Sequence, residues 1–262
     1  MTAGTVGPTR REQRREQTLR EIKDLAMEQI AAGGPEAVSL NGIARTMAMS
    51  PAAIYRYFDN RDALLADIVV EVYDSLADAV EAAGRHAEAA GTPATRGAPT
   101  RDVPTRDVPT PGAPARRLTA VATAFRAWAL EHPNAYRLIF QTTSGSGQDL
   151  APERTIPASS RTMTALLEAL LPLVDTANDD GTDVISPALG EEILAWSGRI
   201  GRPDLPVRVL ALGLMCWTRL HGVISLELGH HLASTGIDPA LLYQAEIDTL
   251  IHCSVRPPSR TS

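Results

Sequence analysis

Apolar side chains recur at helical spacing along most of the chain. In residues 9–32, which contain no Gly or Pro, the stripe consists of Leu19, Ile22, Ala26 and Ile30. The run Gly33-Gly34-Pro35 then ends the pattern. No stretch alternates convincingly with period two, so the pattern predicts an all-α protein.

Capping signals place further helices. Ser50-Pro51, Ser186-Pro187 and Asp238-Pro239 each combine a capping side chain with Pro at the first helical position. Residues 206–228 are apolar nearly all round, which indicates burial against the chain's own bundle and a second subunit. The expected later helices span residues 39–47, 50–58, 61–88, 116–131, 134–142, 158–174, 187–199, 206–228 and 239–254.

Composition changes abruptly after residue 90. Residues 95–114, TRGAPTRDVPTRDVPTPGAP, are four pentads that each end in Pro, which predicts an extended linker without a function of its own. The chain therefore divides into a small amino-terminal domain and a larger helical bundle that the linker interrupts. The expected boundaries are a disordered basic arm at 1–11, a first domain at 12–72, a second at 73–254 with the linker at 91–115, and a disordered tail at 255–262.

Charge and cysteine content narrow the class of protein. The chain has 262 residues and a net charge of −6, yet residues 1–62 carry nine basic and eight acidic residues, so only this part suits a polyanion. Cys216 and Cys253 lack CxxC spacing, which fits a reducing cytoplasm. The amino terminus has no apolar signal region, and the longest apolar run, 209–217, is short for a bilayer. We expect a cytoplasmic protein without a membrane partner.

Residues 49–65, MSPAAIYRYFDNRDALL, gather aromatic rings in a chain that is 4% aromatic. At 100° per residue Ile54 and Phe58 share an inward face, whereas Ala52 and Arg56 project almost oppositely. Small residues permit close backbone approach, and Tyr, Arg and a helix amino terminus suit phosphate. With the preceding short helix, the stretch predicts a helix-turn-helix at 39–58, and the basic run at 10–15 predicts an arm.

This stretch resembles the DNA-binding domain of TetR-type transcriptional regulators. The features that carry the resemblance are Ile43-Ala44, Ser50, the IYRYF run at 54–58, and Asn60-Arg61 before Leu64-Leu65. Two positions depart from the family pattern. Ala48 stands where a turn Gly is usual, which predicts a strained or reshaped turn. Pro51 replaces a common polar residue and removes one possible contact.

The resemblance implies roles for individual positions. Phosphate contacts are implied for Ser39, Ser50, Tyr55 and Arg61, and phosphate or sugar contact for Tyr57. Asn41 and Ala52-Ala53 would face base edges in the major groove, with part of the specificity coming from DNA shape. The full expected DNA-binding set is Ser39, Asn41, Arg45, Ser50, Pro51, Ala52, Ala53, Tyr55, Arg56, Tyr57 and Arg61.

The carboxy-terminal half resembles the WHG-type domain of one TetR subgroup. The matching stretches are EHPNAYRLIFQ at 131–141 and CWTRLHGVISLELG at 216–229. The resemblance implies homodimerisation and binding of a small-molecule effector, which the composition suggests is hydrophobic and neutral or cationic. Side chains that could line the effector cavity, or only pack in the bundle, are Trp128, Phe140, Trp196, Trp217 and His221.

An enzyme is the competing class. The sequence contains no GxxxxGK[ST], GxGxxG, GxSxG or HExxH motif, and acidic pairs such as Glu191-Glu192 are adjacent and point apart. His230-His231 lacks metal-binding helical spacing. We therefore expect no catalytic residue, metal or cofactor. The expected function is a dimeric repressor that a ligand releases from a double-stranded DNA operator; an activator, a regulator without ligand and a helical enzyme are the alternatives.

Overall fold

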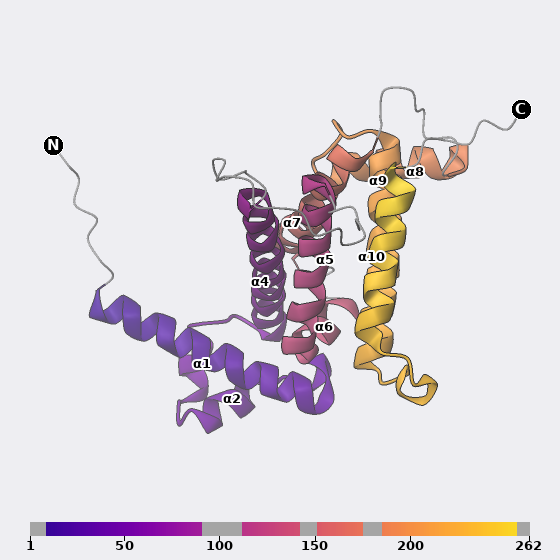
Figure 1. Ribbon diagram of the computed structural model, residues 1–262. Helices are drawn as coiled ribbons and strands as arrows, with labels where there is room; N and C mark the ends of the chain where they lie inside the picture. The colour runs from indigo at the N-terminus through magenta and orange to yellow at the C-terminus, as the bar shows by residue number, and fades with distance from the viewer. Residues whose placement is uncertain (1–8, 91–111, 142–150, 175–184, 256–262) are drawn as a thin grey trace, which may run out of the picture. The chain divides into compact units, whose positions relative to one another are not determined.

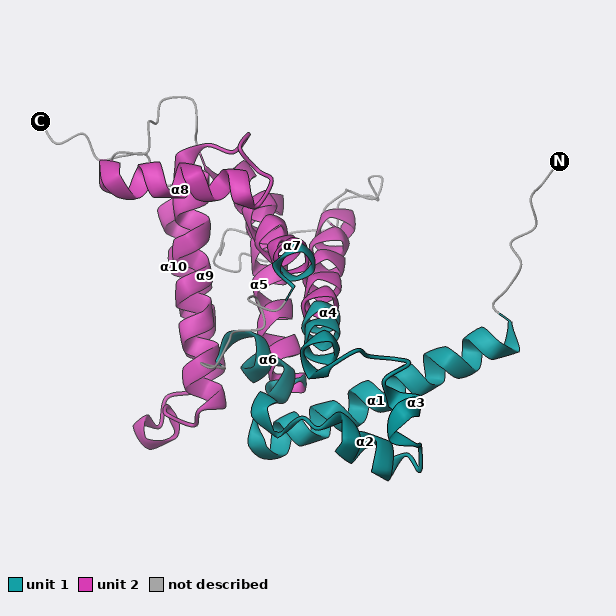
Figure 2. Ribbon diagram, turned by 180° about the vertical axis from the view of Figure 1, so that it is seen from behind, with its two compact units in different colours: residues 1–72, 132–155 teal, residues 73–131, 156–262 magenta. Residues whose placement is uncertain are grey.

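The computed structural model describes residues 9–90, 112–141, 151–174 and 185–255. Every regular element in these ranges is a helix, which confirms the all-α prediction. The chain divides into two compact units (Figure 2). The first comprises residues 1–72 and 132–155, and the second comprises residues 73–131 and 156–262. Two helices, α4 and α7, each contribute residues to both units.

The first unit has a core to which four helices contribute side chains. Its buried side chains include Ile22, Ile43, Ile54 and Leu64, each fully inaccessible to solvent. They come from four helices, one from each of α1, α2, α3 and α4. The elements are α1 (Arg10–Gly33), η1 (Pro35–Ala37), α2 (Leu40–Thr46), α3 (Pro51–Ile54), the first part of α4 (Arg61–Ala90), α6 (Pro133–Phe140) and the first turn of α7 (Pro152–Leu170).

The amino-terminal end of α1 has a capping box. The Thr9 hydroxyl accepts a hydrogen bond from the Glu12 N–H at 3.3 Å, and the Glu12 carboxylate accepts one from the Thr9 N–H at 2.7 Å. This cap places Arg10 and Arg11 in the first turn of α1, so the expected arm at 1–11 is wrong for these two residues. The rest of that arm, residues 1–8, lies outside the described residues.

The second unit is a bundle around α9 (Val207–Leu228). This helix packs against α5 (Ala113–Glu131), α8 (Pro187–Arg199) and α10 (Pro239–Val255), and Figure 1 shows α10 running along it. The short helices η2 (Leu171–Leu173) and η3 (Ala233–Thr235) complete the unit. Gly213 allows α7 to approach closely, because a Cβ there would lie 2.3 Å from Leu167 Cδ2. Among the described helices, α9 passes a length-and-composition test for crossing a membrane, but half of its apolar window is buried inside the protein.

Helices α5 and α7 begin earlier than expected. Helix α5 begins at Ala113, inside the linker expected at 91–115, whose residues 91–111 lie outside the described residues. Helix α7 begins at Pro152 and continues through Pro157, where the pattern predicted a start at 158. Pro157 lacks an N–H and disfavours a helix interior, and for that reason the sequence pattern placed the boundary after it. The expected tail at 256–262 also lies outside the described residues.

Candidate nucleic-acid interface and cleft

Helix α2 begins at a side-chain cap. The Ser39 hydroxyl accepts a hydrogen bond from the Gly42 N–H at 3.1 Å, and the Ser39 N–H donates to Gln29 Oε1 at 2.8 Å. The first bond satisfies a free donor of the first helical turn, and the second ties α2 to α1. Asn41 and Arg45 are exposed one turn apart on this helix. The local geometry therefore leaves both side chains available to an external partner.

The turn after α2 is closed by two backbone hydrogen bonds. The Met49 N–H donates to the Ala44 carbonyl at 2.8 Å, and the Ala48 N–H donates to the Arg45 carbonyl at 3.1 Å. This pair of bonds is the Schellman arrangement, which needs a left-handed residue after the helix. Ala48 takes that position with φ 51°, in the region that glycine favours. The strain expected at Ala48 from the sequence is therefore present in the backbone.

Helix α3 is shorter than expected. Regular α-helix covers only Pro51–Ile54, where the pattern predicted one helix from Ser50 to Phe58. The Tyr57 N–H donates to the Ile54 carbonyl three residues back, at 2.9 Å, so the chain tightens into turns after Ile54. A four-residue helix carries only a small macrodipole, which removes the helix-terminus argument for phosphate binding made from the sequence.

The side chains of this segment divide as expected between core and surface. Ile54 and Phe58 are buried, whereas Tyr55 is 45% exposed. The other expected contact residues follow the same division: Ser50, Pro51, Ala52 and Arg56 are exposed, and Ala53 and Tyr57 are half-buried. The exposed set consists of small, aromatic and cationic side chains of the first unit, and the buried Ile54 interrupts it along the chain.

Arg15 joins this surface from α1. Its guanidinium carbon lies 5.2 Å from the centre of the Tyr57 ring, within the range of a cation–π contact. The sequence placed Arg15 only in a flexible basic run. Arg15 instead lies on α1, which begins at the Thr9 cap, so the helix positions its side chain beside Tyr57.

Arg61 has partners inside the first unit. Its Nη2 donates to the Pro35 carbonyl oxygen at 2.8 Å and lies 3.1 Å from a carboxylate oxygen of Glu36. These contacts fasten the start of α4 to η1. A phosphate contact by Arg61, as the resemblance implied, would have to compete with them.

A second polar cluster in this unit joins three helices. Asp67 of α4 lies 2.8 Å from Lys23 Nζ of α1 and also accepts a hydrogen bond from Arg154 of α7. Burial alone would raise the pKa of the Asp67 carboxyl, but the hydrogen bonds from Lys23 and Arg154 outweigh it and hold that pKa below its ordinary value. The cluster thus links α4 and α7 within the first unit.

The five side chains expected to line an effector cavity belong to two different units and have different neighbours. Phe140 belongs to the first unit, where its ring centre is 5.0 Å from that of Tyr136. Trp128 is buried and donates to Ser75 Oγ at 3.0 Å, and Trp196 packs on the cluster around Leu167. Trp217 and His221 stack at 5.2 Å on one face of α9, as their spacing predicted, and burial lowers the pKa of His221.

A cleft of about 690 Å³ opens in the second unit between α4, α5, α7 and the end of α8. None of the five expected side chains lines it. Its residues were not singled out from the sequence, because no motif marks them and they come from four separate helices. They are Val80, Glu81, Gly84, Arg85, Arg117, Val121, Ile156, Pro157, Ser160, Arg161, Thr164, Ala165, Glu168, Arg199, Ile200 and Gly201.

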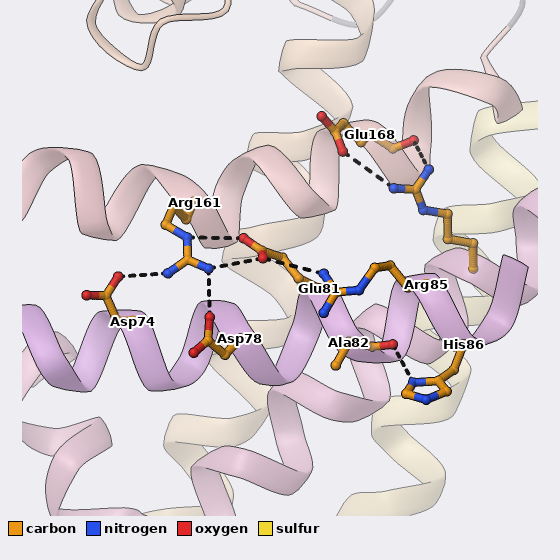
Figure 3. A network of polar contacts seen from close by, with 9 residues as sticks. Asp74, Asp78, Glu81, Ala82, Arg85, His86, Arg161 and Glu168 are labelled. Atoms are coloured by element: carbon orange, nitrogen blue, oxygen red, sulfur yellow. Dashed lines mark hydrogen bonds and ion pairs between the residues drawn. The ribbon is translucent and has the colours of Figure 1, made fainter. Parts of the chain in front are cut away.

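One arginine holds two walls of this cleft together. Arg161 of α7 donates to Asp74 at 2.8 Å, to Asp78 at 2.7 Å and to both oxygens of Glu81 at 3.0 and 3.2 Å (Figure 3). The three carboxylates lie along α4, and they raise the pKa of Arg161, with the hydrogen bond to Asp78 contributing most. The guanidinium thus fixes α7 against α4 within the second unit.

Gly84 of α4 makes room for α5 beside the cleft. A Cβ at this position would lie 3.3 Å from Val121 Cγ2 and 3.6 Å from Arg117 Nε. A glycine in a helix interior costs about 1 kcal/mol relative to alanine. Its presence here lets α5 pack closely on α4 beside the cleft.

In the described part of the chain, no group of three or more His, Cys, Asp and Glu side chains is placed to hold a metal ion.

Comparisons with known proteins agree with this architecture. The family model described as bacterial regulatory proteins of the tetR family matches residues 22–68, and the model described as the carboxy-terminal domain of tetracyclin repressor-like proteins matches residues 118–250. A crystal structure of a protein described as regulatory, SCO4313, is 35% identical, with a TM-score of 0.69 over 93% of this chain and all of that one.

Two mycobacterial relatives extend the comparison. The HTH-type transcriptional regulators Mb1846 of Mycobacterium bovis and Rv1816 of Mycobacterium tuberculosis are each 27% identical over 92% of this chain and 94% of their own. The chain belongs to the TetR family and is a DNA-binding transcriptional regulator. Proteins of this class are normally not enzymes.

Proposed function

We propose that the protein is a cytoplasmic, dimeric repressor that a small molecule releases from its DNA operator. The observation that carries this proposal is the course of α4. Its first residue, Arg61, is hydrogen-bonded to Pro35 in the helix-turn-helix unit, and its residues from Val80 to Arg85 line the cleft. A ligand that changes the position of α4 at the cleft therefore acts on the helix that anchors the DNA-binding unit.

We infer that DNA binding uses the exposed side chains between Ser50 and Arg56. A tyrosine hydroxyl and guanidinium groups donate to phosphate, and Ala52 and Ala53 have side chains small enough for close approach to base edges. Asn41 and Arg45 on α2 extend the same contact surface. We assign phosphate binding to Arg56 ahead of Arg61, because Arg56 is exposed and Arg61 has partners in the fold.

Dimerisation is supported by apolar side chains that remain exposed in the second unit. Leu226 of α9 is 43% exposed and Leu241 of α10 is 70% exposed. A symmetric dimer places two recognition segments on the two halves of a near-palindromic operator. Replacing Leu241 with Glu is expected to shift the chain to monomer in light scattering. An unchanged dimer would place the interface elsewhere.

The DNA face can be tested by a salt titration. DNA that binds the full-length protein is first selected from a random pool. Arg56→Gln is then expected to lower affinity for all sequences and to reduce the slope of log affinity against log salt by about one, since one phosphate contact is lost. Tyr55→Phe should weaken binding by about 1 kcal/mol without changing that slope.

Arg219→Gln is the matched control for this titration. Arg219 is also an exposed arginine, but it lies on α9 in the second unit. It should bind DNA like the parent at every salt concentration. Parent-like binding by Arg56→Gln as well would show that the assigned face does not contact phosphate.

Ligand response is tested with the selected DNA in a screen for compounds that release it. Release by at least one compound, together with increased transcription from a reporter, supports a ligand-released repressor. Decreased transcription on release would instead identify an activator. The absence of any releasing compound would favour a regulator that acts without ligand.

A further inference from the structure

The glutamates that line the cleft are paired with arginines, whereas two of the arginines that line it lack strong partners. Its two acids, Glu81 and Glu168, each contact two guanidinium groups. Glu81 is bound by Arg161 and lies 3.7 Å from Arg85, and Glu168 lies 3.4 Å from Arg117 and 3.3 Å from Arg202. The acids of the cleft are thus neutralised by partners from the protein itself.

Two arginines of the same cleft retain most of their donors. Arg85 is 67% exposed, and its ion pair to Glu81 at 3.7 Å is longer than a hydrogen bond. Arg199, in the last turn of α8, is exposed and has no hydrogen bond or ion pair with another residue in the described ranges. Each guanidinium offers five N–H donors in a fixed planar fork that matches an oxyanion.

The remaining lining is largely apolar. Val80, Val121, Ile156, Ala165 and Ile200 present aliphatic surface to the cleft. A volume of about 690 Å³ lies within the range of sites for small organic ligands. The cleft therefore combines an apolar interior with cationic groups that lack strong partners.

We propose that the ligand of this cleft is an organic anion, an apolar body that carries a carboxylate, phosphate or sulfonate bound by Arg85 and Arg199. The proposal rests on the proposed function and names its ligand class. A cationic ligand would have to displace Arg161 or Arg117 from carboxylates that they already contact. The net charge of −6 suggested a neutral or cationic effector, but the exposed guanidinium groups of Arg85 and Arg199 favour an anionic one at this cleft.

A pair of fluorescent probes tests the proposal on the full-length protein. The anionic probe 8-anilinonaphthalene-1-sulfonate and the neutral probe N-phenyl-1-naphthylamine share one apolar body and differ in the sulfonate. Arg85→Gln and Arg199→Gln are each expected to weaken binding of the sulfonate at least tenfold, because a charge-assisted hydrogen bond is lost. Binding of the neutral probe should change less than twofold.

Arg219→Gln is again the matched control, since Arg219 is 46% exposed and also lies 3.7 Å from a single glutamate, Glu246. It should leave both probes unaffected. Unchanged sulfonate binding in Arg85→Gln and Arg199→Gln, or an equal loss in Arg219→Gln, would overturn the proposal.

Substitutions that fill the cleft with a tryptophan side chain test whether the probes bind there. Ser160 lines the cleft and its neighbour Ser159 does not. Ser160→Trp should remove binding of both probes, and Ser159→Trp should retain it; Thr164→Trp replaces the first variant if that one fails to fold. Sulfonate binding that survives in the filled cleft would overturn the proposal.

The neutral probe separates this proposal from the proposed function. If the neutral probe binds in the cleft and the sulfonate does not, the anion class is wrong and ligand binding by the cleft stands. Failure of the ligand class is thus read from the probes alone, whereas failure of the proposed function is read from the DNA-release screen.

Discussion

Ala48 shows how a single residue can store strain in this fold. The Schellman turn between α2 and α3 requires a left-handed residue, and Ala48 adopts it with φ 51°. For an L-residue with a Cβ this conformation costs about 1–2 kcal/mol. The two backbone hydrogen bonds of the turn hold the residue there, so the helix-turn-helix tolerates the cost.

Ala48→Gly should therefore stabilise the protein by about 1 kcal/mol, because glycine adopts positive φ without the clash. The gain is less than the full strain, since glycine also increases the entropy of the unfolded chain. Urea unfolding at fixed protein concentration measures the change. Ala127→Gly, at an exposed helical position of α5, is the matched control and should destabilise by about 1 kcal/mol. Destabilisation by both substitutions would contradict strain at Ala48.

Residue-level roles were predictable where one short segment determines them. Ile54, Phe58 and Tyr55 were correctly divided between core and surface because helical periodicity alone separates them. The hydrogen bond of Arg61 inside the first unit could not be predicted in this way. Its acceptor is the backbone carbonyl of Pro35, twenty-six residues earlier, and no side-chain pattern marks a backbone acceptor.

At the scale of elements, polar contacts join the helices of the second unit at defined points. Arg126 of α5 donates to both carboxylate oxygens of Glu227 on α9, with its Nε at 2.8 Å. Its guanidinium carbon also lies 5.9 Å from the ring centre of Tyr243 on α10, and the Tyr243 hydroxyl donates to the Ala122 carbonyl of α5 at 2.7 Å. Three helices therefore meet at one partly buried ion pair.

A double-mutant cycle on this pair measures its contribution. Arg126→Ala and Glu227→Ala should each destabilise the protein by about 2 kcal/mol, since each leaves a partly buried charge without its bidentate partner. The double mutant should lose clearly less than the sum. The exposed pair Arg219 and Glu246, 3.7 Å apart, is the control and should show a coupling below about 0.5 kcal/mol. Equal coupling in both pairs would mean that burial and bidentate geometry add nothing.

Helices were predictable as elements, and their ends were less so. The periodic stripes and the Ser-Pro starts located α1, α4, α8 and α10 within a few residues of their observed bounds. Helix α3 ended early because the N–H groups of Arg56 and Tyr57 donate to carbonyls three residues back, where a regular α-helix bonds four residues back. The cleft was not predicted, since its lining comes from four helices whose packing no local pattern encodes.

At the scale of the whole molecule, two helices run through both compact units. Helix α4 passes from one unit to the other at residue 72 and α7 at residue 155. Within each unit the same two helices are joined by ion pairs: Arg154 with Asp67 in the first, and Arg161 with three carboxylates in the second. A ligand in the cleft can shift DNA affinity only if it binds two arrangements of these helices with different affinity.

The proposed ligand response predicts an effect of Arg161 that goes beyond stability. Without its guanidinium, Asp74, Asp78 and Glu81 repel one another along α4, and α7 loses its strongest polar contact with that helix. A compound that releases DNA from the parent lowers the DNA affinity of the parent by a certain factor. In Arg161→Gln the same compound should lower DNA affinity by a smaller factor, closer to one. The factor is obtained by titrating selected DNA with and without saturating compound.

Reciprocity makes the measurement of Arg161→Gln self-checking. The factor by which the compound weakens DNA binding must equal the factor by which DNA weakens binding of the compound. Arg126→Gln is the control, because it breaks another ion pair of the same unit that lies between α5 and α9 and should lower stability while keeping the parent factor. If Arg161→Gln binds compound and DNA separately and still shows the parent factor, the ion pairs between α4 and α7 do not transmit the ligand signal.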